Sequence, residues 1–413
     1  MSGSENKTFC VLPWVNLTTD PSGKIRPCCV SKDFIKKEDG TVYNAGYDSI
    51  EEIYNSPDYV EIRRKMLAGE EVSGCTQCYQ QEKYNNESNR TLHNDIWYKN
   101  PLYLRKRIQR TNITPTINYF DLRFGNLCNL NCRSCGPESS SQFAKELHEI
   151  DHPEISKYHS MEIVDTNSWY NTDMFIKNIE KQLPNIQQLY LTGGEPTIID
   201  KNYEILQLLI DKGFNKTIRI VFNSNMTNTN PKFFSLIRQF NHVTFYASID
   251  GYGTMQEYLR YPSKWSQIDN NIQKILSMTN AVIRPTPVIQ IANLSRITEL
   301  FEYFENFNRI ASKTLIDIRP IILENPSRLD MVNLPLEYKK QAWSKIQEWL
   351  NTSCKYQGSL FHSKMKSLQV RCFTETEYTN ELAEFYNYND IFDNHRNHYL
   401  RDINPELDSL RAK

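Results

Sequence analysis

The chain has 413 residues, enough for two or three domains, and its 39% hydrophobic and 23% charged residues exclude an intrinsically disordered protein. Its formal net charge of -1 provides no overall attraction to nucleic acid or anionic lipid, which argues against a nucleic-acid partner. No N-terminal apolar segment resembles a signal peptide and no run approaches the length of a membrane span, so we expect a cytoplasmic protein without a membrane partner.

The first segment, residues 1–95, contains two separated pairs of cysteines. The first pair is Cys10 and Cys28, and the second is Cys75 and Cys78. A turn signal at 21–24 between two short strands would bring the first pair together, and a helical stretch at 50–67 leads to the second. Without a secretory context, grouped thiols favour metal ligation over disulfides. Four thiols make a closed site, and their spacing fits zinc as well as an iron–sulfur cluster.

Three further cysteines stand apart from these pairs. Cys29 follows Cys28 directly, and adjacent cysteines rarely bind one centre, so we assign Cys28 as the ligand and Cys29 as a packing residue. Cys354 and Cys372 are isolated and are typical of ordinary buried cysteines. Residues 96–115 have the composition of a linker, and the charged run at 105–107 is typical of a solvated surface.

Residues 116–325 alternate between strand-like and helix-like stretches, which indicates a parallel α/β sheet or an open barrel. Strands are predicted at 117–124, 187–192, 217–223, 242–248, 282–291 and 313–321. Helices are predicted near 138–149, 171–183, 201–212, 231–240, 264–279 and 294–309. In such folds the loops after the strands carry the chemistry. Residues 326–413 are predicted to form a helical extension.

The loop after the first of these strands contains Cys128, Cys132 and Cys135 in a C-x3-C-x2-C spacing. Three thiolates within eight residues can hold one inorganic centre on a single loop. Because four ligands close an iron–sulfur or zinc site, three leave one position open to a reacting molecule.

Polar or glycine-rich residues also follow the next three strands. Gly193, Gly194 and Glu195 come after the second strand, where the glycines permit a sharp turn and Glu195 offers an acceptor for an ammonium group. Asn225 follows the third strand and Ser248 the fourth, and both side chains can bond a ribose or an amino-acid head group. A structural protein needs no such arrangement.

The three-cysteine loop followed by Gly-Gly-Glu-Pro resembles the radical S-adenosylmethionine (radical SAM) superfamily, over residues 116–325. The resemblance implies a partial (β/α)6 barrel with a [4Fe–4S] cluster on Cys128, Cys132 and Cys135, whose fourth iron binds S-adenosylmethionine. Reductive cleavage of S-adenosylmethionine would give a 5′-deoxyadenosyl radical that abstracts hydrogen from a substrate. A flavodoxin- or ferredoxin-type reductant is implied as a partner.

The same resemblance implies roles for individual residues. Gly193, Gly194 and Glu195 would hold the methionine amino group, while Asn225 and Ser248 would contact the carboxylate or ribose. Asp250 and Arg260 resemble an Asp-Gly…Arg stretch of peptide-acting members, and Arg260 suits the cofactor carboxylate. Asn293 stands where the family often contacts adenine.

The N-terminal cysteines resemble the SPASM and twitch auxiliary-cluster domains of such enzymes. The resemblance implies that Cys10, Cys28, Cys75 and Cys78 hold an auxiliary iron–sulfur cluster, with [4Fe–4S] preferred to [2Fe–2S] and both preferred to zinc. In many such enzymes this domain follows the radical SAM domain, whereas here it precedes it. The substrate predicted from these relatives is a peptide or protein side chain. A small metabolite or nucleotide is the alternative, and an iron–sulfur electron-transfer or metal-binding protein is the non-enzymatic one.

Overall fold

The computed structural model describes residues 6–83, 87–97, 110–159, 168–323, 325–375 and 380–412. They fall into two compact units. Unit 1 contains Met1–Asn126, Val164–Val221 and Gln239–His242, and unit 2 contains Leu127–Ile163, Phe222–Arg238 and Val243–Lys413. The charged run at 105–107 lies outside the described residues, as does most of the predicted linker. The four-part division of the chain into 1–95, 96–115, 116–325 and 326–413 stays a prediction.

The sheet of unit 1 has the strand order β2-β1-β3-β5-β6. Its strands are β1 (Asn16–Thr19), β2 (Ile25–Arg26), β3 (Tyr119–Arg123), β5 (Gln188–Thr192) and β6 (Arg219–Ser224). β3 and β5 are parallel, with Arg123 opposite Thr192, so the carboxyl ends of the two strands meet at one edge. On β3, Phe120 and Leu122 are fully buried, and Phe124 beyond the strand packs on the rings of Trp169 and Phe175.

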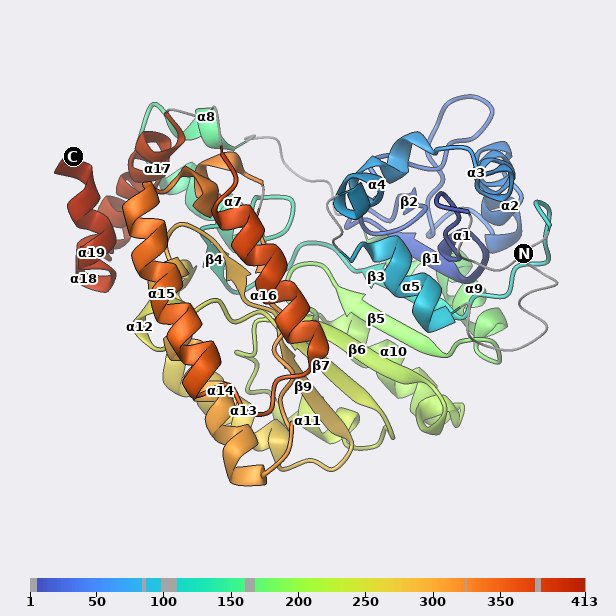
Figure 1. Ribbon diagram of the computed structural model, residues 1–413. Helices are drawn as coiled ribbons and strands as arrows, with labels where there is room; N and C mark the ends of the chain where they lie inside the picture. The colour runs from blue at the N-terminus through green and yellow to red at the C-terminus, as the bar shows by residue number, and fades with distance from the viewer. Residues whose placement is uncertain are drawn as a thin grey trace. The chain divides into compact units, whose positions relative to one another are not determined.

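The N-terminal hairpin extends this sheet. β1 pairs with β2 in antiparallel fashion and with β3 in parallel fashion, with Asn16 opposite Tyr119. The hairpin turn is the predicted one, because Gly23 has φ of +85° and a Cβ there would lie 2.5 Å from the Trp169 ring. Five short helices of the N-terminal region lie in the blue to cyan part of Figure 1, and α1 contacts β1, α3 and α5. They are α1 (Leu12–Val15), α2 (Ile50–Tyr54), α3 (Pro57–Ala68), α4 (Thr76–Lys83) and α5 (Asn89–Trp97).

In unit 2 the strand order is β6-β7-β9, since β6 crosses the boundary between the units. β7 (Val243–Ala247) and β9 (Ala281–Pro285) are parallel along their whole length. Two small pairs accompany them. They are β4 (Asn131–Cys132) with β8 (Arg260–Tyr261), antiparallel, and β10 (Val288–Ile289) with β11 (Ile321–Ile322), parallel.

The strand predicted at 313–321 is wrong as a regular strand, because only β11 at its end is a strand. The chain does run beside 285–289, and the Arg319 and Ile321 N–H groups donate to the Pro285 and Pro287 carbonyls at 2.8 Å. Pro285 and Pro287 have no N–H group, so they accept hydrogen bonds from 319–321 but cannot donate any in exchange.

The predicted core helices are confirmed within a few residues at each end. They are α7 (Ser141–Glu149), α9 (Asp173–Gln182), α10 (Asp200–Asp211), α11 (Pro231–Ile237), α13 (Trp265–Leu276) and α14 (Ile297–Ala311). Side chains that cap the N-terminus set several starts: Ser140 caps α7 and Thr172 caps α9. The short helices α8 (Ile155–Tyr158) and α12 (Thr254–Leu259) complete this part of the chain.

The last part of the chain is helical and belongs to unit 2. Its helices, orange to red in Figure 1, are α15 (Leu336–Thr352), α16 (Ser359–Cys372), α17 (Glu381–Arg396), α18 (Leu400–Ile403) and α19 (Pro405–Asp408). α17 is built around fully buried aromatic residues, including Phe385, Tyr388 and Phe392, and it contacts α8.

Candidate functional site

Four thiols gather in the N-terminal region of unit 1. They belong to Cys10 before α1, Cys28 after β2, Cys75 in the 3-10 turn Ser73–Cys75, and Cys78 in α4. Burial, together with a smaller effect of the nearby thiols, raises the pKa of Cys28 to about 12 and that of Cys75 to about 11. Cys28, Cys75 and Cys78 each raise the pKa of Cys10, and Cys75 and Cys78 also raise that of Cys28. A bound cation that favours thiolates would therefore be needed to deprotonate them at neutral pH.

Cys29 has different neighbours. Burial raises the pKa of its thiol, and the nearest charged groups are Asp121, Cys28 and Arg123. Asp121 and Arg123 belong to strand β3, whereas Cys28 acts together with Cys75 and Cys78 on the pKa of Cys10. The choice of Cys28 over Cys29 as the ligand stays a prediction.

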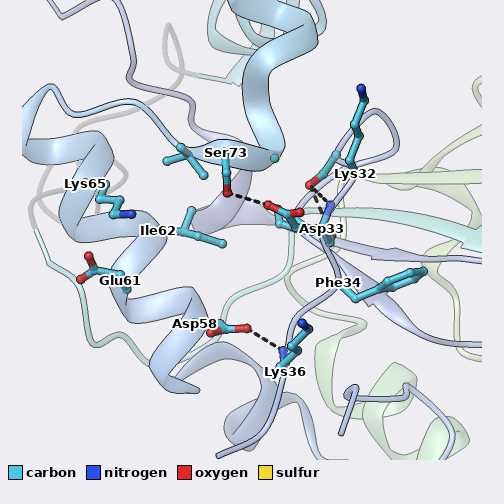
Figure 2. A pocket seen from close by; sticks show the side chains of 13 residues that line it. Lys32, Asp33, Phe34, Lys36, Asp58, Glu61, Ile62, Lys65 and Ser73 are labelled. Atoms are coloured by element: carbon cyan, nitrogen blue, oxygen red, sulfur yellow. Dashed lines mark hydrogen bonds between the residues drawn. The ribbon is translucent and has the colours of Figure 1, made fainter. Parts of the chain in front are cut away.

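Two contacts join the segment after Cys28 to the segment before Cys75. Both lie at the wall of a pocket of about 380 Å³ between residues 31–36 and helix α3, which Figure 2 shows. There the Ser73 hydroxyl donates to Asp33 Oδ2 at 2.8 Å, just before Cys75. A Cβ on Gly74 would lie 2.6 Å from Ser31 Oγ, so the two cysteine-bearing segments touch where only glycine fits.

Helix α5 holds the segment around Cys10. Arg90 Nη1 donates to the Phe9 carbonyl at 2.7 Å, and Asn94 Oδ1 accepts the Val11 N–H at 2.8 Å. Arg90 also pairs with Glu82 on α4, the helix that begins beside Cys75. The positions of the four thiols therefore depend on polar bonds to segments on both sides of them in the sequence.

The second group of thiols, Cys128, Cys132 and Cys135, lies in unit 2 on one loop. Cys128 and Cys132 are 8% and 3% exposed and pack around Leu130, and Cys135 packs against this cluster. Cys132 belongs to β4, opposite Arg260 on β8, and the Cys135 N–H donates to the Cys132 carbonyl at 3.0 Å. The loop is therefore held by backbone bonds and by an apolar residue between its first two cysteines.

A buried ion pair stands against this loop. Arg260 Nε donates to Asp250 Oδ2 at 2.7 Å, and Arg260 Nη1 lies 3.8 Å from Cys132 Sγ. The hydrogen bond from Cys135 and the Arg260 guanidinium together outweigh burial and lower the pKa of Cys132 to about 7. One thiol of the loop is thus poised as a thiolate beside a fixed cation.

The donor set fits an iron–sulfur cluster. Three thiols converge from one loop, one of them close to deprotonation at neutral pH, and thiolates are the ligands that such clusters require. In the described part of the chain, no three His, Cys, Asp or Glu side chains surround a point suited to a single metal ion. A cluster of four irons and four sulfides spreads its thiolate ligands further apart than one zinc ion does.

The Gly-Gly-Glu run lies at the end of β5 in unit 1. Gly193 and Gly194 have φ of +80° and +52°, in the left-handed region. A Cβ on Gly193 would lie 2.8 Å from Arg123 Cβ and 2.9 Å from the Gly125 carbonyl oxygen, so the turn packs on the residues that lead into the cysteine loop. Glu195 is 1% exposed, and its Oε1 accepts the Thr197 N–H and hydroxyl hydrogen bonds.

The remaining predicted residues lie in unit 2. Asn225 is nearly buried and donates to Asn129 Oδ1 at 2.9 Å, so it reaches the cysteine loop directly. Ser248 is half-buried at the end of β7, and its N–H donates to the Ser224 carbonyl. Asn293 is fully buried and bonds the Asp250 and Val288 carbonyls at 2.8 Å, so it braces the segment of Asp250. Their contacts to a cofactor stay predictions.

Sequence reasoning missed two residues of the loop itself, Asn129 and Arg133. Asn129 bonds Asn225 and Thr227, and Arg133 is 1% exposed between Cys132 and Cys135. An arginine between two candidate ligands was the available signal, but its partners are more than 120 residues away in the chain.

Within the described residues, no helix is long and apolar enough to cross a membrane. Residues 122–302 match the family model of the radical SAM superfamily, and residues 10–79 match that of SPASM, an iron–sulfur cluster-binding domain. No curated protein sequence matches the chain.

Several solved structures resemble parts of the chain at low identity. One is native anSMEcpe with bound AdoMet, at 15% identity and a TM-score of 0.38, covering 57% of this chain and 62% of that one. Another is SuiB of Streptococcus suis bound to S-adenosylmethionine, at 11% identity and a TM-score of 0.39. The match covers 86% of this chain and 74% of SuiB. A structure of SuiB bound to precursor peptide SuiA has a TM-score of 0.35 at 11% identity, and the match covers 90% of this chain and 78% of that one. This chain thus spans less than two thirds of anSMEcpe.

Proposed function

Because this chain belongs to the radical SAM superfamily and carries a SPASM domain, we propose that it is an enzyme that abstracts a hydrogen atom from a peptide or protein side chain. The radical SAM domain takes a [4Fe–4S] cluster and S-adenosylmethionine, and the SPASM domain takes auxiliary iron–sulfur chemistry. When bound, these groups supply an electron, a 5′-deoxyadenosyl radical and a second redox centre.

The residues of the chain bind and orient these groups. Cys128, Cys132 and Cys135 would hold the cluster that binds S-adenosylmethionine, and the three-thiol loop is the observation that carries the proposal. Arg260 offers a buried cation beside that loop, already paired with Asp250, which suits the carboxylate of an amino acid. The left-handed turn at Gly193 and Gly194 would direct backbone N–H and C=O groups to the methionine end of the cofactor.

The remaining predicted ligands divide by unit. Glu195 and the Gly-Gly turn would receive the methionine amino group, and Asn225 and Ser248 its carboxylate or the ribose. In unit 1, Cys10, Cys28, Cys75 and Cys78 would hold the auxiliary cluster. The contacts between the segments of Cys28 and Cys75, and the effect of the other three thiols on the pKa of Cys10, support this set. In unit 2, Asn293 would contribute to the S-adenosylmethionine site by holding the Asp250 carbonyl through a hydrogen bond.

The peptide substrate is proposed from the SPASM match at residues 10–79. The resemblance to enzymes with SPASM and twitch domains, which often act on peptides, implies a substrate of this class. An auxiliary centre can accept the electron left on a substrate radical, or it can help to hold a large substrate. A peptide has the size to reach a separate auxiliary domain. A small metabolite or nucleotide is the competing substrate class.

Turnover of S-adenosylmethionine tests the activity. The anaerobically reconstituted and reduced chain should form 5′-deoxyadenosine, the Cys128→Ala variant should form none, and Cys354→Ser, at an isolated half-buried cysteine, should retain activity. No product from the unaltered chain, with both clusters loaded, would favour an electron-transfer protein and end the proposal.

The substrate class can be tested without knowing the substrate. An extract of the source cells grown in deuterated medium is incubated with the enzyme and unlabelled S-adenosylmethionine, and deuterium in 5′-deoxyadenosine is measured. Protease treatment of the extract should abolish the transfer if the substrate is a peptide or protein. Transfer that survives proteolysis and passes a small-molecule filter would establish a metabolite or nucleotide instead.

A further inference from the structure

Helix α17 of the C-terminal extension binds the cysteine loop of unit 2. The helix spans Glu381–Arg396 and lies outside residues 122–302, which match the radical SAM family model. Four of its side chains bond the segment Asn131–Cys135, which contains two of the three candidate cluster ligands.

The first attachment is to Arg133, which stands between Cys132 and Cys135. Its guanidinium donates from Nη2 to Asp393 Oδ1 at 2.7 Å and from Nη1 to Asn389 Oδ1 at 3.0 Å. Nε donates to the Tyr258 carbonyl at 3.1 Å, and the cation lies 3.8 Å from the centre of the Tyr258 ring. A side chain that sits inside the ligand motif is thus directed away from the thiols and fixed on α17.

The second attachment is to the backbone of the loop. The Tyr388 hydroxyl donates to the Arg133 carbonyl at 2.7 Å. Arg396 Nη2 donates to the Asn131 carbonyl at 2.8 Å while its Nε and Nη2 bond both carboxylate oxygens of Glu146 on α7. The Asn131 and Arg133 carbonyls, on either side of Cys132, are therefore held by Arg396 and Tyr388, which lie about two helical turns apart on α17.

These contacts leave the loop little freedom. Arg133 is 1% exposed and Arg396 is 8% exposed, so their carboxylate partners are the groups that compensate two buried charges. Asp393 uses its second oxygen to accept the Leu400 N–H at 2.7 Å, which ties the end of α17 to the same ion pair. A loop that must present three thiolates at fixed positions gains from such outer supports.

Resting on the proposed function, we propose that α17 is a positioning element for the cluster. Asp393, Tyr388 and Arg396 hold the Asn131–Cys135 segment in the geometry that retains an iron–sulfur cluster on the three thiols. They are positioning residues, because their hydrogen bonds to the loop go to its backbone and to the Arg133 side chain.

The test uses two matched pairs of variants in the full chain. Asp393→Asn is compared with Asp390→Asn, since Asp390 is on the same helix but pairs with exposed Arg411. Tyr388→Phe is compared with Tyr386→Phe, since the Tyr386 hydroxyl also donates to a backbone carbonyl at 2.7 Å, that of Leu407. The tyrosine pair removes only a hydroxyl, so it stays informative where the aspartate variant folds poorly.

The measurement is the rate at which each reconstituted chain loses iron to a chelator under anaerobic conditions. A Cys128→Ala chain gives the rate for the auxiliary cluster alone. We expect Asp393→Asn to lose the cluster of the three-cysteine loop about 10-fold to 100-fold faster than Asp390→Asn, as for supports of metal ligands elsewhere. Tyr388→Phe should lose it about two-fold to ten-fold faster than Tyr386→Phe, the size of one hydrogen bond.

Equal rates within both pairs would overturn the inference. So would faster loss from both clusters together with a lower melting temperature of the iron-free Tyr388→Phe chain, because that result describes general destabilisation. Failure of the proposed function is separate, since it is read from the absence of 5′-deoxyadenosine in the unaltered chain, whereas iron retention is measured without turnover.

Discussion

The Asp250–Arg260 pair makes a quantitative prediction about the cluster's reduction potential. Asp250 is fully buried, bonds Arg260 Nε at 2.7 Å and accepts the Val288 N–H at 2.9 Å, while Arg260 Nη1 lies 3.8 Å from Cys132 Sγ. The Asp250→Asn substitution keeps the size and a carbonyl acceptor for Val288 but removes one negative charge. Arg260 then faces the cluster as an uncompensated cation, which stabilises the reduced, more negative state.

The expected shift follows from the charge and its distance. With a separation of about 8 Å and an effective dielectric constant of about 20, one unit charge changes the energy of an added electron by about 2 kcal/mol. For a one-electron couple this corresponds to a rise of about 90 mV in the reduction potential. The cluster of the Asp250→Asn variant should also be reduced by a weaker electron donor. Once reduced, it should have a smaller driving force for cleavage of S-adenosylmethionine.

The assay is a redox titration followed by electron paramagnetic resonance, in which the relevant cluster is the one whose signal changes when S-adenosylmethionine is added. Asp330→Asn is the matched control, because Asp330 is also buried in unit 2 and paired with an arginine, Arg371. A shift below about 20 mV in Asp250→Asn, or an equal shift in Asp330→Asn, would refute the electrostatic reasoning.

The remaining predictions concern unit 1. Cys28→Ala should lower the iron content by about four per chain while Cys29→Ala leaves it unchanged, and the reverse result would exchange their roles. Gly74→Ala should reduce auxiliary-cluster iron, because its Cβ would meet Ser31 Oγ at 2.6 Å, whereas Gly358→Ala meets no atom within 4 Å and should not. Burial lowers the pKa of His93 to about 4, below its unfolded value, so the unfolded chain binds the extra proton. The free energy of unfolding of the iron-free chain should then fall by up to about 3 kcal/mol between pH 6.5 and 4, and less in His93→Gln, by urea titration. Parallel pH profiles for the two chains would contradict this assignment.

Much of the architecture could be predicted because its signals are local. The cysteine spacing, the turn at Gly23 and the capped helices depend on residues within a few positions of one another. The family was predicted from two such local motifs and is confirmed over residues 122–302 and 10–79. The strand expected at 313–321 failed for a reason outside its own segment, because the prolines that interrupt its ladder lie on the neighbouring segment, at 285 and 287.

What could not be predicted depends on residues distant in the chain. The pairing of β1 with β3 joins residues about 100 positions apart, and the register is set by packing that no single segment contains. The same holds for Arg133, whose bonds to Asn389 and Asp393 span 256 and 260 positions. The sequence predicted a helical extension over residues 326–413 but carried no sign of the loop that α17 binds.

The loop that carries Cys128, Cys132 and Cys135 adjoins three buried ion pairs, those of Arg133, Arg260 and Arg396 with Asp393, Asp250 and Glu146. Apolar side chains in their place would be at least as stabilising in an ordinary core. Here the loop exposes backbone carbonyls that need donors and thiols that must ionise, and arginine supplies both a donor and a positive charge. The paired carboxylates cancel most of that charge, so the loop is held by hydrogen bonds without the strong rise in potential that three unpaired cations would cause. By this reasoning the carboxylates, which no cysteine motif contains, keep the potential of the cluster low enough for reductive chemistry.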